Sequence, residues 1–494
     1  MYKTDHKNIL TNSFLLYLLP VTLLVVIAFF TGKNNFEVAL PLIGIVLGFG
    51  AYFIVRLNLQ IYLLKTIAVL LPFSIEIPFI MNSMIRFPGE FLIAIAAIAL
   101  VIEIFRQPLK DLTNLFHREF LWAFPLIIAY LISIPFSEML FVSVKFSFIN
   151  ILYILVFLVF LARHLKKNPQ LFSQLLLLYG VGIIIVWIWG FYRLWQWEFN
   201  PIVMRGIFQP FYKDHTIFGA SSALLAAVFF VSGFQNRSAL NRFLLWGFSA
   251  VFLFMVIFSA SRAAFLSMLF MMIILLMMLI KFRVKHLVVS ALVITLITLS
   301  FSGSLEDRLN RVNTISYDEH AGFMERTESA ANITTDVSNI ERLNRWVSAL
   351  RMFKERPLTG FGPGTYQFTY IPYQKPDLMN RLSVTNPFEP PEGSGGTAHS
   401  EYLLALSEMG IFGILGWVIL LGRWIFIAFE KSRNHPCRWM ILSAIAGLST
   451  YIFHANFNNF LTTDKFAFLF WGTAAWLITN LYGTENKPGI LPAG

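Results

Sequence analysis

Long apolar runs, separated by short polar segments, make up most of this chain. A helix needs about 20 residues to cross a bilayer, and many of the runs approach that length. The runs lie at Ser13–Thr31, Val38–Val55, Ile61–Met81, Phe91–Phe105, Phe120–Pro135, Phe146–Leu161, Leu175–Tyr192, Thr216–Phe234, Leu244–Ala260, Ala263–Ile280, Leu287–Phe301, Ile411–Phe429, Met440–Phe457 and Phe466–Leu481. The pattern predicts an all-α polytopic membrane protein with about 12–14 transmembrane helices.

One polar segment is much longer than the others and runs from Ser304 to Ser400. It divides the chain into N-terminal transmembrane helices at 1–303 (about eleven), a large loop at 304–400, and C-terminal transmembrane helices at 401–494 (about three). A polar segment of this size between membrane helices predicts that the chemistry of the protein takes place there. We expect the loop to contain short helices.

Composition and charge support this interpretation. Hydrophobic residues make up 57% of the chain and charged residues only 13%, whereas charged residues make up about 25% of a soluble globular protein. The net charge is +11, but the basic residues fall mainly in alternate short loops, as the positive-inside rule describes. This placement argues against a nucleic acid partner. It also predicts that both termini are cytoplasmic and that the 304–400 loop lies outside.

Within the loop, the pattern from Ser338 onward predicts an amphipathic helix. Ser338 and Glu341 have the spacing of a capping box, apolar residues follow at helical spacing, and Pro357 ends the helix. Arg342 and Arg345 fall on one face, where two planar guanidinium groups suit the oxygens of a phosphate. The alternative is that the two arginines form a solvated face or reach lipid headgroups.

Three glycines in five residues follow this helix, at Gly360, Gly362 and Gly364. They predict a turn that allows close approach of another backbone segment. The proline-rich segment beyond the turn is expected to be extended. Its aromatic residues, Tyr370 and Tyr373 among them, could stack on sugar rings or pack within the loop.

A glycine-rich linker then leads to His399, beside a helix that is predicted to begin near Glu401. Thr397 or Ser400 is expected to cap this helix. The positive end of a helix disfavours imidazolium, which keeps the ring neutral and able to accept a proton near neutral pH. His399 is therefore a candidate general base. The alternative is a capping or interfacial histidine.

Arg262 lies between two apolar runs with almost no loop, at the predicted outer boundary of the membrane. An arginine at this depth is costly and indicates a functional site, although a side chain that extends from a helix end to the lipid headgroups would also explain it. Further candidate substrate contacts are Arg205, His215, Tyr366 and Tyr402. No metal site is predicted, because the loop lacks a close carboxylate pair such as Asp-x-Asp for Mg²⁺.

Several motifs occur in an order that resembles the O-antigen ligase and O-antigen polymerase superfamily of bacterial membrane glycosyltransferases. The resemblance covers roughly residues 205–425. Its motifs are Ser261-Arg262, Glu341-Arg342-x-x-Arg345-Trp346, Pro357-Leu358-x-Gly360-x-Gly362-x-Gly364, Ala398-His399-Ser400-Glu401-Tyr402 and Glu408-x-Gly410-Ile411-x-Gly413. The chain departs from the family in having Ser400 where Asn is common, and more predicted helices than ligases usually have.

The resemblance implies a GT-C-type helical fold in the bacterial cytoplasmic (inner) membrane, with an active site that faces outward. It implies transfer of a glycan from an undecaprenyl-diphosphate carrier to an acceptor hydroxyl, with inversion and without a metal or other cofactor. It implies that His399 is the general base and that Arg262, with Arg345 or Arg342, binds the diphosphate. The expected partners are this lipid-linked donor, a lipid- or glycan-linked acceptor and membrane lipids.

Other functions remain as alternatives to a ligase. A polymerase of repeat units would use the same carrier and chemistry, with a lipid-linked glycan as acceptor too. A polysaccharide transporter or flippase would place charged residues at mid-membrane and show related halves, whereas here the distinctive cations cluster at one face and in one loop. A scaffold for envelope assembly would need only the helices and would leave the arginine and histidine pattern unexplained.

Overall fold

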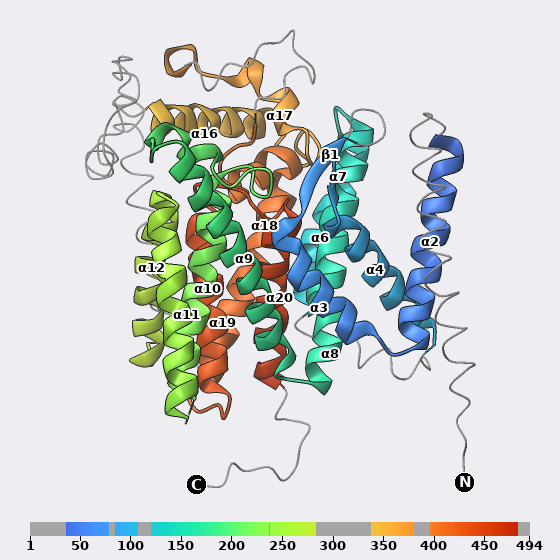
Figure 1. Cartoon of the computed structure of the whole chain (residues 1–494). Coiled ribbons are helices and arrows are strands. Elements are labelled where there is room, and N and C mark those ends of the chain that lie inside the picture. The colour runs from blue at the N-terminus through green and yellow to red at the C-terminus, as the bar shows by residue number, and fades with distance from the viewer. Residues whose placement is uncertain are drawn as a thin grey trace.

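The computed structural model describes residues 36–78, 84–106, 120–236, 238–282, 337–379 and 396–482. Helices form almost all of this part of the chain and gather in one bundle (Figure 1). In chain order, the elements are α2 (Phe36–Arg56), α3 (Gln60–Leu70), η1 (Leu71–Phe73), β1 (Ile75–Pro78), β2 (Met84–Phe87), α4 (Gly89–Phe105), η3 (Phe120–Ala123), α6 (Phe124–Ser133), η4 (Ile134–Phe136), α7 (Leu140–Tyr153), η5 (Ile154–Phe160), α8 (Leu161–Lys167), α9 (Leu171–Gln196), η6 (Pro201–Gly206), α10 (His215–Gln235), α11 (Ala239–Phe258), α12 (Arg262–Leu279), α16 (Val337–Glu355), α17 (Tyr366–Thr369), η7 (Ile371–Tyr373), η8 (Pro376–Leu378), α18 (Glu401–Lys431), α19 (Arg438–His454) and α20 (Asp464–Tyr482).

Within the described residues, six helical stretches are long and apolar enough to cross a membrane. They are Leu140–Lys167, Leu171–Gln196, His215–Gln235, Ala239–Phe258, Arg262–Leu279 and Glu401–Lys431. This confirms an all-α polytopic membrane protein. The predicted helices at Ser13–Thr31 and Leu287–Phe301 lie outside the described residues, so a total of about 12–14 helices stays a prediction.

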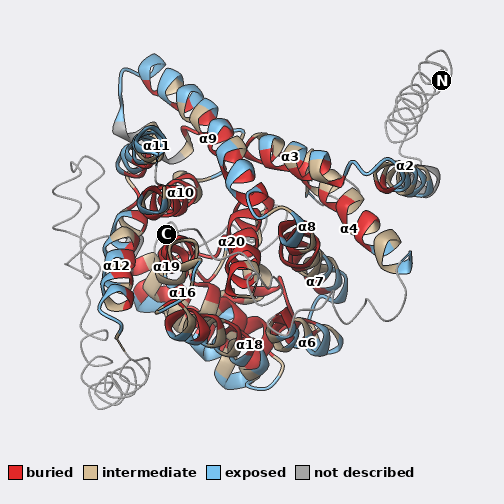
Figure 2. Cartoon of the chain, turned by 90° about the horizontal axis from the view of Figure 1, so that it is seen from below, coloured by how far each residue is buried: buried red, intermediate tan, exposed pale blue. Residues whose placement is uncertain are grey.

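The helix α20 occupies the centre of the bundle and is buried almost throughout (Figure 2). Its Phe468 packs edge-on against Phe157, with 5.5 Å between ring centroids, and stacks on Tyr179 at 5.4 Å. Such ring pairs add about 0.5–1.5 kcal/mol beyond the area that they bury. The outer helices α11 and α12 expose apolar side chains on their outward sides (Figure 2), as expected of a surface that meets lipid tails.

The predicted transmembrane run at Ile61–Met81 is wrong in its second half. Here α3 ends at Leu70, and η1, which contains Pro72, leads into a short antiparallel hairpin of β1 and β2. Proline cannot donate the backbone hydrogen bond that a continuing helix needs. In the hairpin Glu76 pairs with Arg86 across the strands, where opposite charges stabilise the pairing.

Two of the basic loops meet at the end of the bundle that lies opposite α16 (Figure 1). Arg433, which follows α18, donates to the carbonyl oxygen of Phe282, which follows α12, at 3.2 Å. The ends of α12 and α18 that were predicted to share one side of the membrane therefore lie together. Which side of the membrane this is stays a prediction.

The predicted amphipathic helix of the polar segment is present as α16, which lies across one end of the bundle (Figure 1). One prediction about it was wrong: Ser338 is not the N-cap, because Val337 before it is already helical. The apolar face of α16 buries Ala349 and Met352 in a small core with Tyr366 and Leu404. This core holds α16 against the start of α18.

Candidate functional site

The glycine turn after α16 is docked on α18. The carboxylate of Glu408 accepts hydrogen bonds from the backbone N–H groups of Gly364, at 2.7 Å, and Tyr366, at 3.0 Å. Gly360 has φ +66° and Gly410, at a kink in α18, has φ +62°. A Cβ at either glycine would collide with backbone atoms of the other segment, so only glycine fits. The predicted close backbone approach is confirmed, and it fixes where α16 lies.

His399 directly precedes the cap of α18. The N-cap is Ser400, whose hydroxyl accepts from the N–H of Leu403 at 3.3 Å, so the alternative of His399 as the capping residue is wrong. His399 has φ +49°, a conformation uncommon for a residue other than glycine. Its carbonyl oxygen accepts from Nε1 of Trp346, on α16, at 3.4 Å. Thus α16 and the start of α18 together place the imidazole.

Glu341, Arg345 and His399 form a compact cluster. Oε1 of Glu341 lies 2.9 Å from Nη2 and 3.0 Å from Nε of Arg345, and 3.7 Å from Nε2 of His399. The side chain of His399 is 28% exposed, that of Glu341 14% and that of Arg345 3%. The carboxylate therefore lies between a buried guanidinium and a partly exposed imidazole.

The surroundings of Glu341 favour its charged form. Burial raises the pKa of the carboxyl group, but the contact with His399 and the charge and hydrogen bonds of Arg345 outweigh burial. The pKa of Glu341 is therefore below the usual value for glutamate. An ionised carboxylate next to the imidazole can accept its N–H and stabilise its protonated form.

The guanidinium of Arg345 contacts other groups of the protein. Besides the two contacts with Glu341, Nη1 donates to the carbonyl oxygen of Thr397 at 3.2 Å, and the guanidinium carbon lies 5.2 Å from the centre of the Tyr370 ring. The hydroxyl of Tyr366 donates to the carbonyl oxygen of Arg345 at 2.8 Å. These contacts tie α16 to the segment before α18. Arg342, one turn earlier on α16, is partly exposed.

The candidate tyrosines use their hydroxyls within the protein. Tyr366 is fully buried and stacks on Tyr370, with 5.1 Å between ring centroids. The hydroxyl of Tyr402 donates to the carbonyl oxygen of Ile452 at 3.0 Å. Residues 366–378 form α17, η7 and η8, so the prediction of an extended segment was wrong there. Tyr370 therefore packs within the loop, as the alternative interpretation held.

Arg262 is the first residue of α12, in the tight turn that follows α11. The hydroxyl of Ser261 caps α12 by accepting from the N–H of Ala264 at 3.4 Å. This turn packs against Gly219 of α10, where an added Cβ would lie 2.5 Å from Oγ of Ser259. Because Gly219 lies one turn after the start of α10, Arg262 lies at the end of the bundle where α10 begins.

The start of α10 holds a second candidate histidine. Nδ1 of His215 lies 2.9 Å from Oδ1 of Asp214, and Asp214 caps α10 by accepting from the N–H of Thr216. Burial raises the pKa of Asp214, but contacts with His215 and Thr216 outweigh it and hold that pKa well below the usual value. Arg205 belongs to η6, and its side chain lies outside the described residues.

Sequence reasoning missed His454, the last residue of α19. His454 is buried, and its Nε2 lies 2.9 Å from Nδ2 of Asn458. Electrostatic interactions connect it to Arg342 on α16 and to Asp214 at the start of α10. A histidine at a helix end followed by an asparagine-rich segment was the available signal. His454 therefore lies near both Arg342 and the beginning of α10.

The N-termini of α10, α12 and α18 lie at this end, each with an Asp or Ser cap. Helix N-termini carry a partial positive charge and bind anions. Among the described residues, no group of three or more His, Cys, Asp or Glu side chains is placed to hold a metal ion.

A family model described as O-antigen ligase matches residues 247–418. These residues are called the O-antigen ligase domain below, after the family model that they match. The match begins within α11 and ends within α18, so it includes Arg262, α16, the glycine turn and His399. It confirms the resemblance that the sequence motifs predicted. A comparison with curated proteins found no match.

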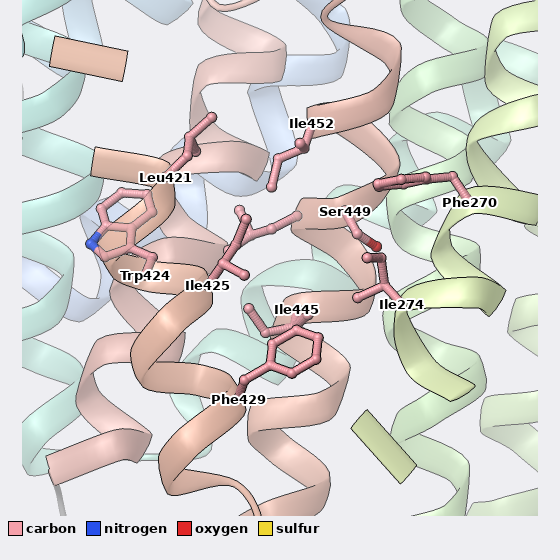
Figure 3. A pocket seen from close by; sticks show the side chains of 10 residues that line it. Phe270, Ile274, Leu421, Trp424, Ile425, Phe429, Ile445, Ser449 and Ile452 are labelled. Carbon is pink, nitrogen blue, oxygen red and sulfur yellow. The ribbon is translucent and has the colours of Figure 1, made fainter. Parts of the chain in front are cut away.

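An apolar cavity lies deeper in the bundle between α12 of the O-antigen ligase domain and helices α18 and α19 (Figure 3). Phe270 and Ile274 line it from α12, and Trp424 lines it from α18. The hydroxyl of Ser449, on α19, donates to the carbonyl oxygen of Ala446, so it offers the cavity no free donor. Phe270 follows Arg262 by two helical turns, which is about 12 Å along the helix.

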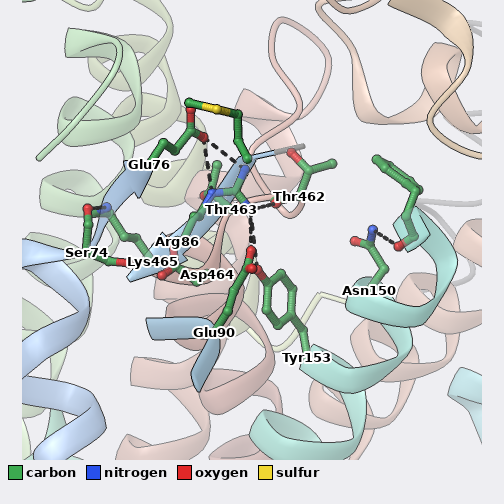
Figure 4. A network of polar contacts seen from close by, with 12 residues as sticks. Ser74, Glu76, Arg86, Glu90, Asn150, Tyr153, Thr462, Thr463, Asp464 and Lys465 are labelled. Atoms are coloured by element: carbon green, nitrogen blue, oxygen red, sulfur yellow. Dashed lines mark hydrogen bonds and ion pairs between the residues drawn. The ribbon is translucent and has the colours of Figure 1, made fainter. Parts of the chain in front are cut away.

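A second charged network lies outside the O-antigen ligase domain (Figure 4). Nη2 of Arg86, on β2, lies 3.2 Å from Glu76 on β1, and Nη1 donates to the carbonyl oxygen of Thr462 at 2.9 Å. Nζ of Lys465, in the first turn of α20, donates to the carbonyl oxygen of Ser74. This network joins the β hairpin to the start of α20.

Proposed function

We propose that the protein is a membrane glycosyltransferase of the O-antigen ligase type. It transfers a glycan from an undecaprenyl-diphosphate carrier to an acceptor hydroxyl at the outer face of the cytoplasmic membrane. The observation that carries this proposal is the imidazole of His399, which is partly exposed, lies 3.7 Å from a carboxylate, and belongs to the O-antigen ligase domain.

His399 acts as the general base of the transfer. It accepts the proton of the acceptor hydroxyl as that oxygen attacks the anomeric carbon of the donor sugar. The new carbon–oxygen bond forms as the bond to the diphosphate breaks, so a single displacement inverts the anomeric carbon. Positioned acid–base catalysis of this kind contributes about 10²- to 10⁴-fold to a rate.

Arg262 and Arg342 stabilise the departing diphosphate. Both are partly exposed, and both lie at the end where helices α10, α12 and α18 begin. Fixed cations and helix N-termini stabilise developing negative charge without reorganising. We assign Arg345, which is buried against Glu341 and Thr397, to holding α16 in place. Arg205, His215, Tyr366 and Tyr402 stay candidates for support of the substrate site.

The apolar cavity supports a donor with a hydrocarbon chain. A diphosphate bound near Arg262 would leave the isoprenoid chain free to extend along α12 toward Phe270 and Ile274 (Figure 3). Each buried CH₂ group contributes about 0.8 kcal/mol. The wholly apolar lining of this small cavity suits hydrocarbon and offers nothing to the polar groups of a soluble nucleotide sugar.

The glycan profile of a deletion strain tests the proposal. Loss of a ligase should leave carrier-linked polymer unattached, whereas loss of a polymerase, which uses the same chemistry, should leave single repeat units. An unchanged profile would contradict both. Transfer by the purified protein should persist in EDTA, because the proposed mechanism uses the arginines rather than a metal, and loss of transfer on chelation would contradict that part.

A further inference from the structure

Glu341 contacts a guanidinium and an imidazole through one oxygen atom. Oε1 lies within 3.0 Å of two guanidinium nitrogens of Arg345 and 3.7 Å from Nε2 of His399. Arg345 is four residues further along α16, whereas His399 comes from the segment that precedes α18. The Glu341–His399 contact therefore exists only because the chain folds α16 over α18.

The two partners of Glu341 differ in how they are held. Arg345 is buried and fixed on three sides by Glu341, the Thr397 carbonyl and the Tyr370 ring. This leaves the carboxylate of Glu341 with a defined position. The imidazole of His399, by contrast, is partly exposed, so one edge of the ring faces Glu341 while the ring stays accessible to a ligand.

We propose that Glu341 is a positioning residue for His399. Its carboxylate accepts the Nε2–H of the imidazole, which places the lone pair on Nδ1, and it stabilises the imidazolium that forms during transfer. This inference rests on the proposed function, in which His399 is the general base. The acceptor O–H bond breaks and the Nδ1–H bond forms, while the other proton stays bonded to Nε2 and faces the Glu341 carboxylate throughout. A carboxylate that orients a histidine in this way is also a part of hydrolase triads.

Of the charged side chains on the described elements packed around His399, Glu341 is the one found in contact with the imidazole. On α16 these charges are Arg342 and Arg345, and arginines stay protonated at all working pH values. The start of α10 contributes Asp214 and His215. The end of α19 contributes His454, which interacts with Arg342 and Asp214. The carboxylate of Glu401, at the start of α18, accepts from the hydroxyl of Tyr451.

The test compares Glu341→Gln with a control on the same helix, Glu355→Gln. Glutamine keeps the size of the side chain and one acceptor oxygen but removes the charge. Glu341→Gln should lower kcat by about 10²-fold or more, by analogy with the roughly 10⁴-fold loss when a triad aspartate becomes asparagine. KM for the lipid-linked donor should change little. Glu355 accepts from the hydroxyl of Tyr373 at an exposed site, so Glu355→Gln should retain activity.

The pH profile separates positioning from a structural role. Loss of a negative charge 3.7 Å from the ring disfavours imidazolium, so the acid limb of kcat/KM should move to lower pH. If Glu341 only held α16 in place, Glu341→Gln would lower thermal stability and would not move the acid limb of kcat/KM. An unmoved limb with normal kcat per folded molecule would overturn the inference.

A double variant distinguishes failure of this inference from failure of the proposed function. If Glu341 acts through His399, then Glu341→Gln added to His399→Ala should cause no further loss of kcat, because residues that act as a unit are not additive. An additive loss would overturn the inference. If His399→Ala itself stays active, the proposed function fails instead. If His399→Ala is inactive while Glu341→Gln behaves like wild type, only the inference about Glu341 fails.

Discussion

The Arg86 network and the His399 site lie at the same end of the bundle and use charge differently. Arg86 contacts two carboxylates, those of Glu76 and Glu90, and also donates to a backbone carbonyl. At the other cluster a single carboxylate, Glu341, contacts both Arg345 and His399. One cluster surrounds its cation with acids, and the other shares one acid between two partners.

This difference separates a cluster that holds the fold from one suited to chemistry. The Arg86 network connects β1, β2, α4 and the start of α20, segments that are far apart in the sequence. The His399 site has a partly exposed imidazole, and the arginines Arg262 and Arg342 lie at the same end. A ligand with negative charge and an exchangeable proton fits only the second. The predictions below test this division.

The largest expected effect is on stability, in the Arg86 network. Arg86→Ala should destabilise the protein by up to about 3–5 kcal/mol, because it removes the guanidinium that the carboxylates of Glu76 and Glu90 both contact. Thermal unfolding in detergent measures this. Arg106→Ala, which removes an exposed arginine at the end of α4, is the control and should change little. Turnover per folded molecule should stay normal, and a stable but inactive Arg86→Ala would break the comparison.

The next effect is on transfer, at Arg262 and Arg342. Replacing either with alanine should lower kcat by about 10²- to 10³-fold, as for loss of one group that stabilises transition-state charge. Lysine should restore only part of this, because it keeps the charge but loses the planar fork. Arg242→Lys at the far end of α11 is the control. Full activity of both lysine variants would show that these arginines anchor to headgroups.

Glu408→Gln should have a smaller effect, on the docking of α16. The amide oxygen of glutamine can replace one of the two carboxylate acceptors. The backbone N–H of Gly364 or Tyr366 then loses its partner, which lowers stability by about 1–3 kcal/mol. Stability and transfer should fall together, since α16 positions His399 through Trp346. The control is Glu430→Gln, an exposed position on the same helix. A fall in transfer with unchanged stability would show that Glu408 takes part in the transfer reaction rather than in the docking of α16.

The smallest effect concerns acid pH. Because the folded pKa of Glu341 is depressed, its contribution to stability is complete above the usual value of 4.5 and is lost as pH falls through the folded value. Thermal stability should therefore drop as the pH falls below about 5, with about 1 kcal/mol or less due to Glu341. The drop should be smaller in Glu341→Gln. An equal drop in both proteins would contradict the Glu341 contacts.

Local features of the site could be predicted from the sequence. The helix predicted from Ser338 to the stop at Pro357 is α16, the Ser261-Arg262 pair lies in a turn between two helices, and Ser400 caps α18. Each of these depends on neighbouring residues: apolar spacing, a polar cap or a proline. The same motifs predicted the O-antigen ligase superfamily.

Contacts between distant segments could not be predicted. Glu341 fitted a capping box by spacing, yet its carboxylate contacts His399, and Glu408 accepts hydrogen bonds from the glycine turn. The strand β1 was predicted to be membrane helix because its apolar residues continue the run from α3. The partners of Glu341 and Glu408 are set by how α16 folds over α18, which no local spacing encodes.

The central claim, that His399 is the general base, is tested most directly by measuring lipid-linked glycan transfer and thermal stability for His399→Ala, His399→Asn and the control His435→Ala. Since Ser400 already caps α18, asparagine at position 399 cannot rescue by capping. Both His399 variants should lose about 10²- to 10⁴-fold in transfer with near-normal stability, and His435→Ala should stay active. An active His399→Asn enzyme would contradict the account.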